Sequence, residues 1–220
     1  MFYEPDKGDH GLKYNPFKSI AVPRPIGWIS TLGLNGVVNL APYSQFQNIG
    51  FDPPYVMFSS SSRLGDSATN AQDTSEFVCN MATYDLREQV NITAQKAPRD
   101  VSEADLAGLE MVPSRIVKPP RVAASPVHME CRFQCAVTLP GARPGSNDVV
   151  IIGRVVGIHV KDEFITPDGR IDIAKIRPLA RLGYMDYTSV TDIFTMPPVG
   201  TGKDGLSFGL EGRPGRERVK

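Results

Sequence analysis

The stretch VHMECRFQCAVTL, residues 127–139, sets apolar and polar side chains in regular alternation. Every odd-numbered position from Val127 to Cys135 is apolar, and every even-numbered position from His128 to Gln134 is polar. Because side chains alternate across a β-strand, this period of two predicts a long, half-buried strand. The segment VVIIGRVVGIHV, residues 149–160, predicts a second long strand, with glycines where bulges or barrel bends would need them.

Shorter strand-like segments come earlier: PIGWIST (25–31), VVNLAPY (37–43), YVMFSS (55–60) and EFVCNM (76–81). The residues GLNG at 33–36 predict a hairpin turn between the first two. Helices are fewer, and we expect them at 84–95, with Asp85 and Glu88 forming a capping box, at 102–109, and near Asp66 or Ser67. Frequent strands and few helices predict a mainly β protein with a closed or nearly closed barrel.

The chain has 220 residues, which fits one large domain or two small ones. We expect a single domain over residues 1–195. Residues 196–220 are rich in glycine, proline and charge, so they cannot bury much apolar surface and predict an extended or disordered tail. The alternative is an arm that wraps a partner subunit.

Charge and composition exclude several classes of function. The formal net charge is zero, with 24 basic and 24 acidic residues, so no overall field recruits nucleic acid or an anionic membrane. No apolar run approaches the roughly 20 residues of a membrane helix, and the N-terminus does not resemble a signal peptide. The three cysteines form no CxxC pair and read as small buried hydrophobes in a reducing compartment, hence the cytoplasm. The three histidines lie far apart, so no metal site is expected.

A run of hydroxyl side chains follows the strand-like segment at 55–60: FSSSSRLGDSATN, residues 58–70. Serine hydroxyls and loop N–H groups can converge on a phosphate, and Arg63 can add a planar cationic fork. A helix that begins at Asp66 or Ser67 would add its N-terminal N–H groups. The segment therefore predicts a cradle for one monophosphate, formed by Ser59–Ser62, Arg63 and Ser67. The alternative is a solvated loop, and the acidic Asp66 counts against an anion unless it caps the helix.

Two further segments could line a ligand. In NLAPYS (39–44), the asparagine and serine could hydrogen-bond a polyhydroxyl chain, and the alanine and proline permit close approach of a flat ring. The alternative is a strand that runs into a proline turn. In RPIGWIST (24–31), a cation precedes a strand that ends in two hydroxyls, and the lone Trp28 is expected in the core.

The order of these segments along the chain is itself informative. It is RPIGWIST, NLAPYS, DPP (52–54), FSSSSR, DSATN and EFVCNMATYDLREQVN, with RPLARLGYMDY (177–187) near the C-terminus. The ordered set resembles the flavin reductase-like family, the FMN-binding split β-barrels that include flavoredoxin-type proteins. The resemblance implies an FMN-binding split β-barrel and a homodimer with FMN near the interface. It also implies an oxidoreductase that accepts hydride from NADH or NADPH onto FMN and passes electrons to a small-molecule or protein acceptor.

The resemblance also implies a set of cofactor contacts. The hydroxyls at the end of RPIGWIST would lie beside the flavin ring or ribityl chain, the serine run would hold the 5′-phosphate, and the C-terminal segment would approach the site, from the same or the partner subunit. The residues implied are Ser30, Thr31, Asn39, Ala41, Pro42, Tyr43, Ser44, Ser59, Ser60, Ser61, Ser62, Arg63, Asp66, Ser67, Asn70, Arg181 and Tyr184. The hydride step needs no side-chain acid or base, so no catalytic residue is assigned. Asn147-Asp148 stands where many family members carry a histidine, which leaves that histidine's nicotinamide-facing role unassigned.

Three alternatives stay open at this point. The chain could be an FMN electron-transfer protein that a protein partner reduces, without a nicotinamide site. It could be an oxidase of the pyridoxamine-phosphate oxidase kind, which shares the split barrel and would need a second basic cluster from Arg24, Arg177 and Arg181. It could also be a non-enzymatic flavin-binding or interaction protein.

Overall fold

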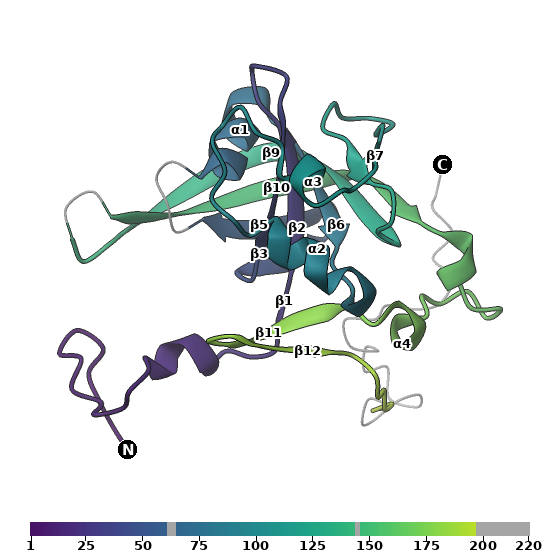
Figure 1. The fold of residues 1–220 in the computed structure, drawn as a ribbon. Helices are drawn as coiled ribbons and strands as arrows, with labels where there is room; N and C mark the ends of the chain where they lie inside the picture. Colours follow the sequence, from purple (N-terminus) through teal and green to yellow (C-terminus); the bar gives the residue numbers. More distant parts are fainter. Residues whose placement is uncertain (61–64, 144–145, 197–220) are drawn as a thin grey trace.

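The computed structural model describes residues 1–60, 65–143 and 146–196 of the chain (Figure 1). Its largest element is an antiparallel sheet in the strand order β3–β2–β6–β9–β10–β5–β4. These strands are β2 (Gly27–Leu32), β3 (Val38–Tyr43), β4 (Phe46–Phe51), β5 (Pro54–Ser60), β6 (Glu76–Met81), β9 (Val127–Pro140) and β10 (Asn147–Val160). The sheet curls into a split β-barrel, and the short turn at Ser44 and Gln45 joins its two edge strands, β3 and β4. The prediction of a mainly β barrel is confirmed.

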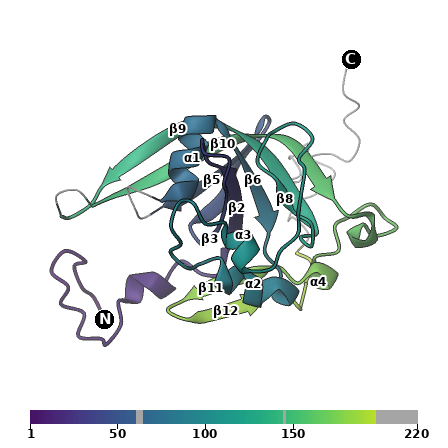
Figure 2. The same ribbon diagram turned by 45° about the horizontal axis from the view of Figure 1, so that its top comes forward.

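Two smaller sheets and several short helices complete the fold. The three-stranded sheet holds β1 (Arg24–Pro25), β11 (Leu179–Gly183) and β12 (Asp186–Ser189), and the two-stranded sheet holds β7 (Met111–Val112) and β8 (Arg121–Val122). The α-helices are α1 (Asp66–Thr74), α2 (Arg87–Ile92), α3 (Glu103–Leu106) and α4 (Ile173–Ile176). Single 3-10 turns lie at η1 (Pro16–Ser19), η2 (Tyr84–Leu86) and η3 (Asp162–Phe164). The β1–β11–β12 sheet runs along the underside of the barrel, and α1 lies at the opposite end (Figures 1 and 2).

The two long strands pair with each other over almost their whole length and project as a hairpin beyond the rest of the sheet (Figure 1). Their register shifts between Ile152 and Gly153 and again between Val155 and Gly157, which confirms the predicted bulges. At Gly153 the backbone passes so close to Phe77 that a β-carbon would clash with the ring. The glycine therefore lets β10 bend over the core at this point.

Two hydrophobic clusters lie on opposite faces of β2. Ile29 packs inside the barrel with Phe58, Phe77 and the residues of α1 that face inward. Trp28 points the other way and packs with Leu40 and with residues of α2, α3, β8 and β11. Because both faces of β2 are covered, almost the whole strand is buried and its hydrophobic pattern does not reveal which face is which.

The helices differ from the sequence-based expectation at their ends. The predicted capping box of Asp85 and Glu88 is wrong: the segment begins as a 3-10 turn after Thr83, and α2 has no side-chain cap. At α3 the prediction holds, because Ser102 Oγ accepts the N–H of Asp105. Helix α1 begins at Asp66 as predicted, but its N-cap is Gly65, so Asp66 does not cap it.

The polar face of β9 is buried near the start of the strand and exposed at Arg132 and Gln134, so the reading of this stretch as a half-buried strand is wrong only for its first residues. His128 and Glu130 are 3% and 0% exposed, because the segment 113–125 folds over them. Glu130 accepts the backbone N–H groups of three successive residues, Arg115, Ile116 and Val117, at 2.8, 2.6 and 3.0 Å. A strand that looks amphipathic is thus buried on both faces near its start.

The prediction that all three cysteines are buried is confirmed for two of them. Cys79 and Cys131 are buried, as predicted, but Cys135 lies on the projecting part of β9 and is exposed. Strand β12 ends at Ser189, within the predicted domain 1–195. Residues 197–220 of the predicted tail lie outside the described residues.

Candidate functional site

A cavity of about 770 Å³ lies between strands of the barrel and the segment that follows α2. One wall is β3 with the turn that follows it, and the opposite wall is the segment 93–99 after α2. The end of β5, the N-terminus of α1 and the first residue of α3 complete it. The lining residues are Asn39, Ala41, Pro42, Tyr43, Ser44, Gln45, Ser59, Ser60, Gly65, Asp66, Thr93, Ala94, Gln95, Lys96, Ala97, Pro98, Arg99 and Glu103.

A buried polar network stands behind the β3 wall. Asn39 Nδ2 donates to Ser67 Oγ at 2.7 Å and lies 3.3 Å from Thr31 Oγ1, which also accepts from Asn70 Nδ2 at 3.1 Å. All four side chains are at most 7% exposed. The network therefore fixes Asn39 and ties β3 to the first turns of α1, which meet the cavity at Gly65 and Asp66.

Burial shifts the pKa values of two titratable groups in the cavity wall. Burial raises the pKa of the Tyr43 hydroxyl, against the opposing effect of hydrogen bonds from Ser67 and Ser60. Burial also raises the pKa of Glu103, while the hydrogen bond from the Leu40 N–H, at 3.0 Å, acts in the opposite direction. Tyr43 thus offers the cavity a hydroxyl rather than a phenolate, and Glu103 ties α3 to β3.

Charged groups gather at the end of the cavity near α1. Arg99 reaches it from the segment 93–99 and Asp66 reaches it from the helix, while Lys96 lines the cavity from the same segment as Arg99. Arg99 Nε lies 2.6 Å from Asp66 Oδ1, although that buried oxygen has no hydrogen-bond donor. We therefore regard the contact as an ion pair of poor hydrogen-bond geometry.

The structure brings together many of the residues predicted from the sequence. Eight of them line the cavity: Asn39, Ala41, Pro42, Tyr43, Ser44, Ser59, Ser60 and Asp66. Thr31, Ser67 and Asn70 stand behind the wall and hold it in place. Ser61, Ser62 and Arg63 lie outside the described residues.

Three predicted residues lie elsewhere in this chain. Ser30 is on the opposite face of β2 from Thr31, and its hydroxyl donates to the Pro120 carbonyl at 2.6 Å. Arg181 stacks on Tyr187 in the β11–β12 hairpin, and the Tyr184 hydroxyl donates to the Asn15 carbonyl. Neither side chain of the hairpin lines the cavity of its own chain.

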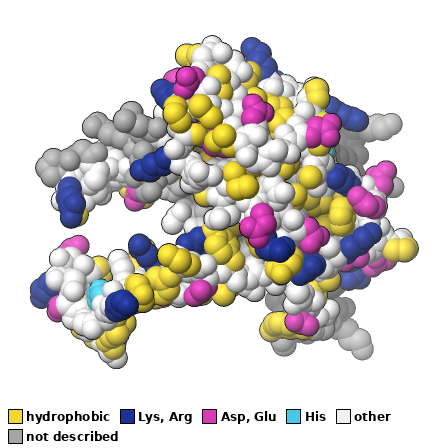
Figure 3. Space-filling model, in the orientation of Figure 1, with side chains coloured by type: hydrophobic (Ala, Val, Ile, Leu, Met, Phe, Trp, Pro, Cys, Tyr) yellow, Lys and Arg dark blue, Asp and Glu magenta, His cyan; other side chains and the backbone are white. Residues whose placement is uncertain are grey.

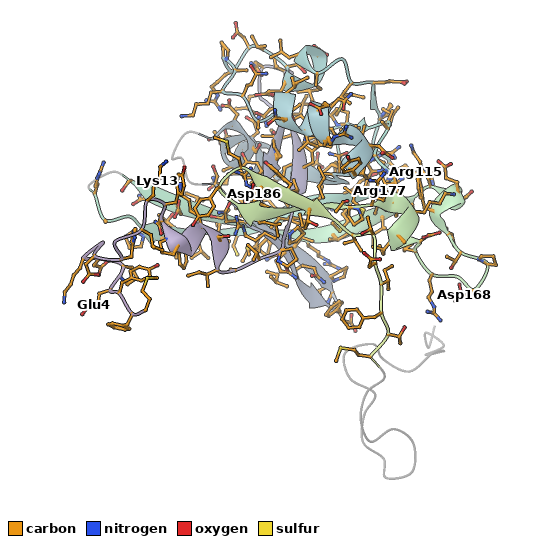
Figure 4. The ribbon with its side chains drawn as sticks, turned by 60° about the horizontal axis from the view of Figure 1, so that its bottom comes forward. Glu4, Lys13, Arg115, Asp168, Arg177 and Asp186 are labelled. Carbon is orange, nitrogen blue, oxygen red and sulfur yellow. The ribbon has the colours of Figure 1, made fainter. Side chains whose placement is uncertain are left out.

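The second basic cluster that an oxidase of the pyridoxamine-phosphate kind would need is not assembled. Arg24 and Arg181 are register partners on β1 and β11, whereas Arg177 stacks on Tyr84, with 4.0 Å between guanidinium and ring centroid. With the underside of the molecule turned forward, Asp186 lies toward one end of the β11–β12 hairpin and Arg177 lies toward the other (Figure 4). The structure thus offers no observation in favour of that alternative.

Sequence reasoning missed the whole 93–99 wall. The prediction of a helix through residue 95 assigned part of it to regular structure, and Lys96 and Arg99 were not considered as ligands. The available signal was a pair of cations flanking Pro98, directly after a helix that carries no cap. Glu103 could not have been found this way, because its role depends on contact with β3.

The described residues, 1–60, 65–143 and 146–196, contain no group of three or more histidine, cysteine or acidic side chains arranged for a metal ion. None of their helices is long and apolar enough to cross a membrane.

The fold defines a class of protein, the split β-barrels, and comparison with known proteins narrows this class to one family. Residues 19–176 match the family described as "Flavin reductase like domain". An uncharacterized protein of Aquifex aeolicus is 36% identical over 183 residues, covering 81% of this chain and 90% of its own. An uncharacterized protein of Methanothermobacter thermautotrophicus is 34% identical over 204 residues, covering 89% and 95%.

Solved structures show the same relationship. Nitrilotriacetate monooxygenase component B from Bacillus cereus superposes with a TM-score of 0.82 at 28% identity, covering 89% of this chain and 98% of its own. The flavoredoxin of Desulfovibrio vulgaris (Miyazaki F) has a TM-score of 0.72 at 17% identity, covering 89% and 100%, which shows a shared fold. The chain belongs to the flavin reductase-like family, as the order of its motifs predicted.

Proposed function

We propose that the chain binds FMN in the cavity between β3 and the segment 93–99 and acts as a flavin reductase that uses NADH or NADPH. The observation that carries this proposal is the cavity itself. Its volume of about 770 Å³ lies within the roughly 300–1,000 Å³ of small-molecule sites. Small side chains at Ala41 and Pro42 leave room for a flat ring against one wall, and Lys96 supplies a cation at the other.

The charged end of the cavity suits the phosphate of FMN. Helix α1 has nine residues, and its N-terminus, with N–H groups that have no acceptor within the helix, meets the cavity at Gly65. Ser59 and Ser60 face the same space from β5, and Lys96 faces it from the opposite wall. Hydroxyl donors, helix N–H groups and a cation are the groups that bind a phosphate monoester. Arg63, which we predicted for the same role, lies outside the described residues.

Bound FMN would supply the redox chemistry, taking up a hydride from NADH or NADPH and passing two electrons to a small-molecule or protein acceptor. The chain itself binds and orients the ring. Its β3 wall is held by the Asn39–Ser67 hydrogen bond and by the contact of Glu103 with the Leu40 N–H. The protonated Tyr43 hydroxyl remains available as a neutral hydrogen-bonding group at neutral pH.

The phosphate assignment can be tested with Lys96→Ala. We expect a loss of about 1.5–3 kcal/mol in FMN affinity, the range for hydrogen bonds to a charged group, which is about 10- to 150-fold in Kd. Riboflavin has no phosphate, so its Kd should stay within about twofold. Lys161→Ala is the matched control, because that ammonium contacts the Ala124 carbonyl and does not line the cavity. Equal losses for FMN and riboflavin would show that Lys96 acts on the fold rather than on the phosphate.

The reductase activity has its own test. Anaerobic addition of NADH or NADPH to the FMN-loaded protein should bleach the visible absorption band of the oxidised flavin. If neither nicotinamide bleaches this band although FMN is bound, the chain is not a reductase, and the result favours an electron carrier that a protein partner reduces. A colourless protein that takes up no added FMN would refute the flavin proposal altogether.

We further propose a homodimer in which the C-terminal hairpin of one subunit approaches the cavity of the other. The N-terminal segment, residues 1–22, stands away from the barrel and carries exposed apolar side chains (Figure 3), among them Leu12, Tyr14 and Phe17. Such exposure is typical of an interaction surface. Arg181 and Tyr184 lie beside this segment and outside their own cavity, which supports a role across the interface. If light scattering gives the molar mass of a monomer and the protein still binds FMN tightly, the proposed dimer is refuted.

A further inference from the structure

A pocket of about 270 Å³ lies between α2 and the end of the β11–β12 hairpin nearest Arg177 (Figures 1 and 4). Its lining residues are Tyr84, Arg87, Glu88, Val90, Asn91, Leu179, Tyr187, Thr188 and Ser189, and none of them lines the proposed FMN cavity. An apolar cavity of about 150 Å³ is enough to hold a benzene molecule. The pocket therefore has room for one aromatic ring with a short polar group, and it is smaller than the roughly 300–1,000 Å³ of sites for larger ligands.

The inner part of this pocket is apolar. Val90 of α2 and Leu179 of β11 are its most buried lining residues and form its floor, at 3% and 6% exposed. The Tyr187 ring lines one side, and the Arg181 guanidinium stacks on this ring at 4.4 Å from its centroid. An aliphatic floor beside an aromatic ring favours a flat apolar group, because aromatic rings pair through offset or edge contacts.

Two opposite charges stand side by side in the wall of the pocket. Arg87 Nε lies 3.5 Å from Glu88 Oε1, and the two side chains are 46% and 73% exposed. Such an exposed ion pair contributes little to stability, so a ligand can replace this contact at little cost. Other groups hold the Arg87 guanidinium in place, because it lies 4.2 Å from the Tyr84 ring centroid and donates to the Tyr84 carbonyl at 2.9 Å.

This pair of charges matches the head group of a free α-amino acid. The ammonium and the carboxylate of such a ligand are attached to one carbon atom, so a single head group can meet two neighbouring charges of opposite sign. Both contacts would be charge-assisted hydrogen bonds. A simple aromatic acid would bring its carboxylate close to Glu88, and a simple amine would bring its ammonium close to Arg87. A peptide terminus carries only one of the two charges.

We propose that this pocket binds a free aromatic α-amino acid. The ring of the ligand lies on Val90 and Leu179 beside Tyr187. The ligand carboxylate binds Arg87, and the ligand ammonium binds Glu88. This binding site is separate from the proposed flavin site, because the two cavities share no lining residue.

The test is isothermal titration calorimetry with L-phenylalanine and three analogues that each lack one part of it. We expect L-phenylalanine to bind with a Kd below about 1 mM, and to bind equally well with and without FMN. The analogues are 3-phenylpropanoate without the ammonium, 2-phenylethylamine without the carboxylate and L-alanine without the ring, and each should bind at least about tenfold more weakly.

Three outcomes of this titration would overturn the proposal. One is the absence of L-phenylalanine binding at about 10 mM. Another is a Kd for 3-phenylpropanoate equal to that for L-phenylalanine, which would make the pocket a site for a simple aromatic acid. The third is competition between L-phenylalanine and FMN, because it would place the amino acid in the flavin cavity. The titration is informative whether or not the chain binds FMN, so its failure is distinct from failure of the proposed function.

Two variants locate the site. Glu88→Gln keeps the shape of the side chain and removes its charge, so it should weaken L-phenylalanine binding by about tenfold or more and should not weaken 3-phenylpropanoate binding. Arg87→Gln should weaken the binding of both ligands. Asp85→Asn is the matched control, because the Asp85 side chain is 75% exposed, contacts Arg177 at 3.7 Å and does not line the pocket. An effect of Asp85→Asn as large as that of Glu88→Gln would also overturn the proposal.

Discussion

Replacing Glu130 by glutamine should cost the fold a large part of its stability, by an amount that depends on pH. The carboxylate is fully buried and receives three backbone N–H groups from the segment 113–125, as well as His159 Nε2 at 2.5 Å. Burial alone would raise the pKa of Glu130, but the Arg115 N–H, His159 and the next two N–H groups outweigh it and lower the pKa from 4.5 to about 2.

The size of the effect follows from the linkage between protonation and folding. A pKa that is lower in the folded state stabilises the fold above the unfolded value of 4.5, and the stabilisation is lost as pH falls toward 2. At about 1.4 kcal/mol for each pKa unit, Glu130 contributes about 3 kcal/mol at pH 7 and about 1.4 kcal/mol at pH 3. Glutamine cannot carry the charge, and its amide group would face N–H donors.

Urea unfolding of the wild type and Glu130→Gln at pH 7 and pH 3 measures both quantities. We expect the difference in unfolding free energy to shrink by about 2 kcal/mol between the two pH values. Glu76→Gln is the matched control, because Glu76 accepts a single N–H of the same segment, from Lys118 at 2.9 Å, and should cost about 1 kcal/mol. A Glu130→Gln loss no larger than that of Glu76→Gln, or one that is equal at both pH values, would refute this account of the buried carboxylate.

Three further predictions concern groups away from the cavity. Iodoacetamide should label only Cys135 in the native protein and all three cysteines in denaturant. Burial raises the pKa of the Cys131 thiol, and Cys79 is also buried, so neither thiol should react in the folded protein. Labelling of more than one thiol in the native protein would contradict this prediction. Burial lowers the pKa of His128 to about 4, so its ring resonances should not titrate between pH 8 and 5, and its stabilisation of the fold should be lost as pH falls from 6.5 toward 4. Gly153→Ala should destabilise the protein by about 1–3 kcal/mol in thermal unfolding, because the new methyl group meets a buried aromatic ring of β6; an unchanged midpoint would show that the strand can shift.

Much of the barrel was predictable because its strands carry local signals. The alternation at 127–139, the glycine bulges in β10 and the turn at 33–36 depend on nearby residues, and all three are present. Strand β4, Phe46–Phe51, was not predicted, because its short mixed sequence becomes a strand only by pairing with β5. Sequence patterns express local preference, and pairing with a distant strand overrides it.

The site could be predicted only where its residues belong to the motifs whose order along the chain resembles the family. Ser30 and Thr31 are adjacent hydroxyls in a strand that is buried on both faces, so no hydrophobic pattern could show that only Thr31 faces the α1 side. Glu130 looked like a solvent-facing residue because the segment that covers it lies elsewhere in the sequence. Lys96 lies after a helix whose end had no clear stop signal. In each case the missing information is a tertiary contact.

The position of Trp28 allows its intrinsic fluorescence to report ligand binding in the cavity. It is the only tryptophan, it is fully buried, and its indole N–H donates to Thr93 Oγ1 at 2.9 Å. Thr93 is the first residue of the 93–99 cavity wall, so the fluorophore sits one side chain away from the proposed ligand. Indole emission overlaps the near-ultraviolet absorption of oxidised flavin, and energy transfer at so short a distance should be efficient. Occupancy of the cavity could then be followed from the unlabelled protein, in real time, by the quenching of a single emitter.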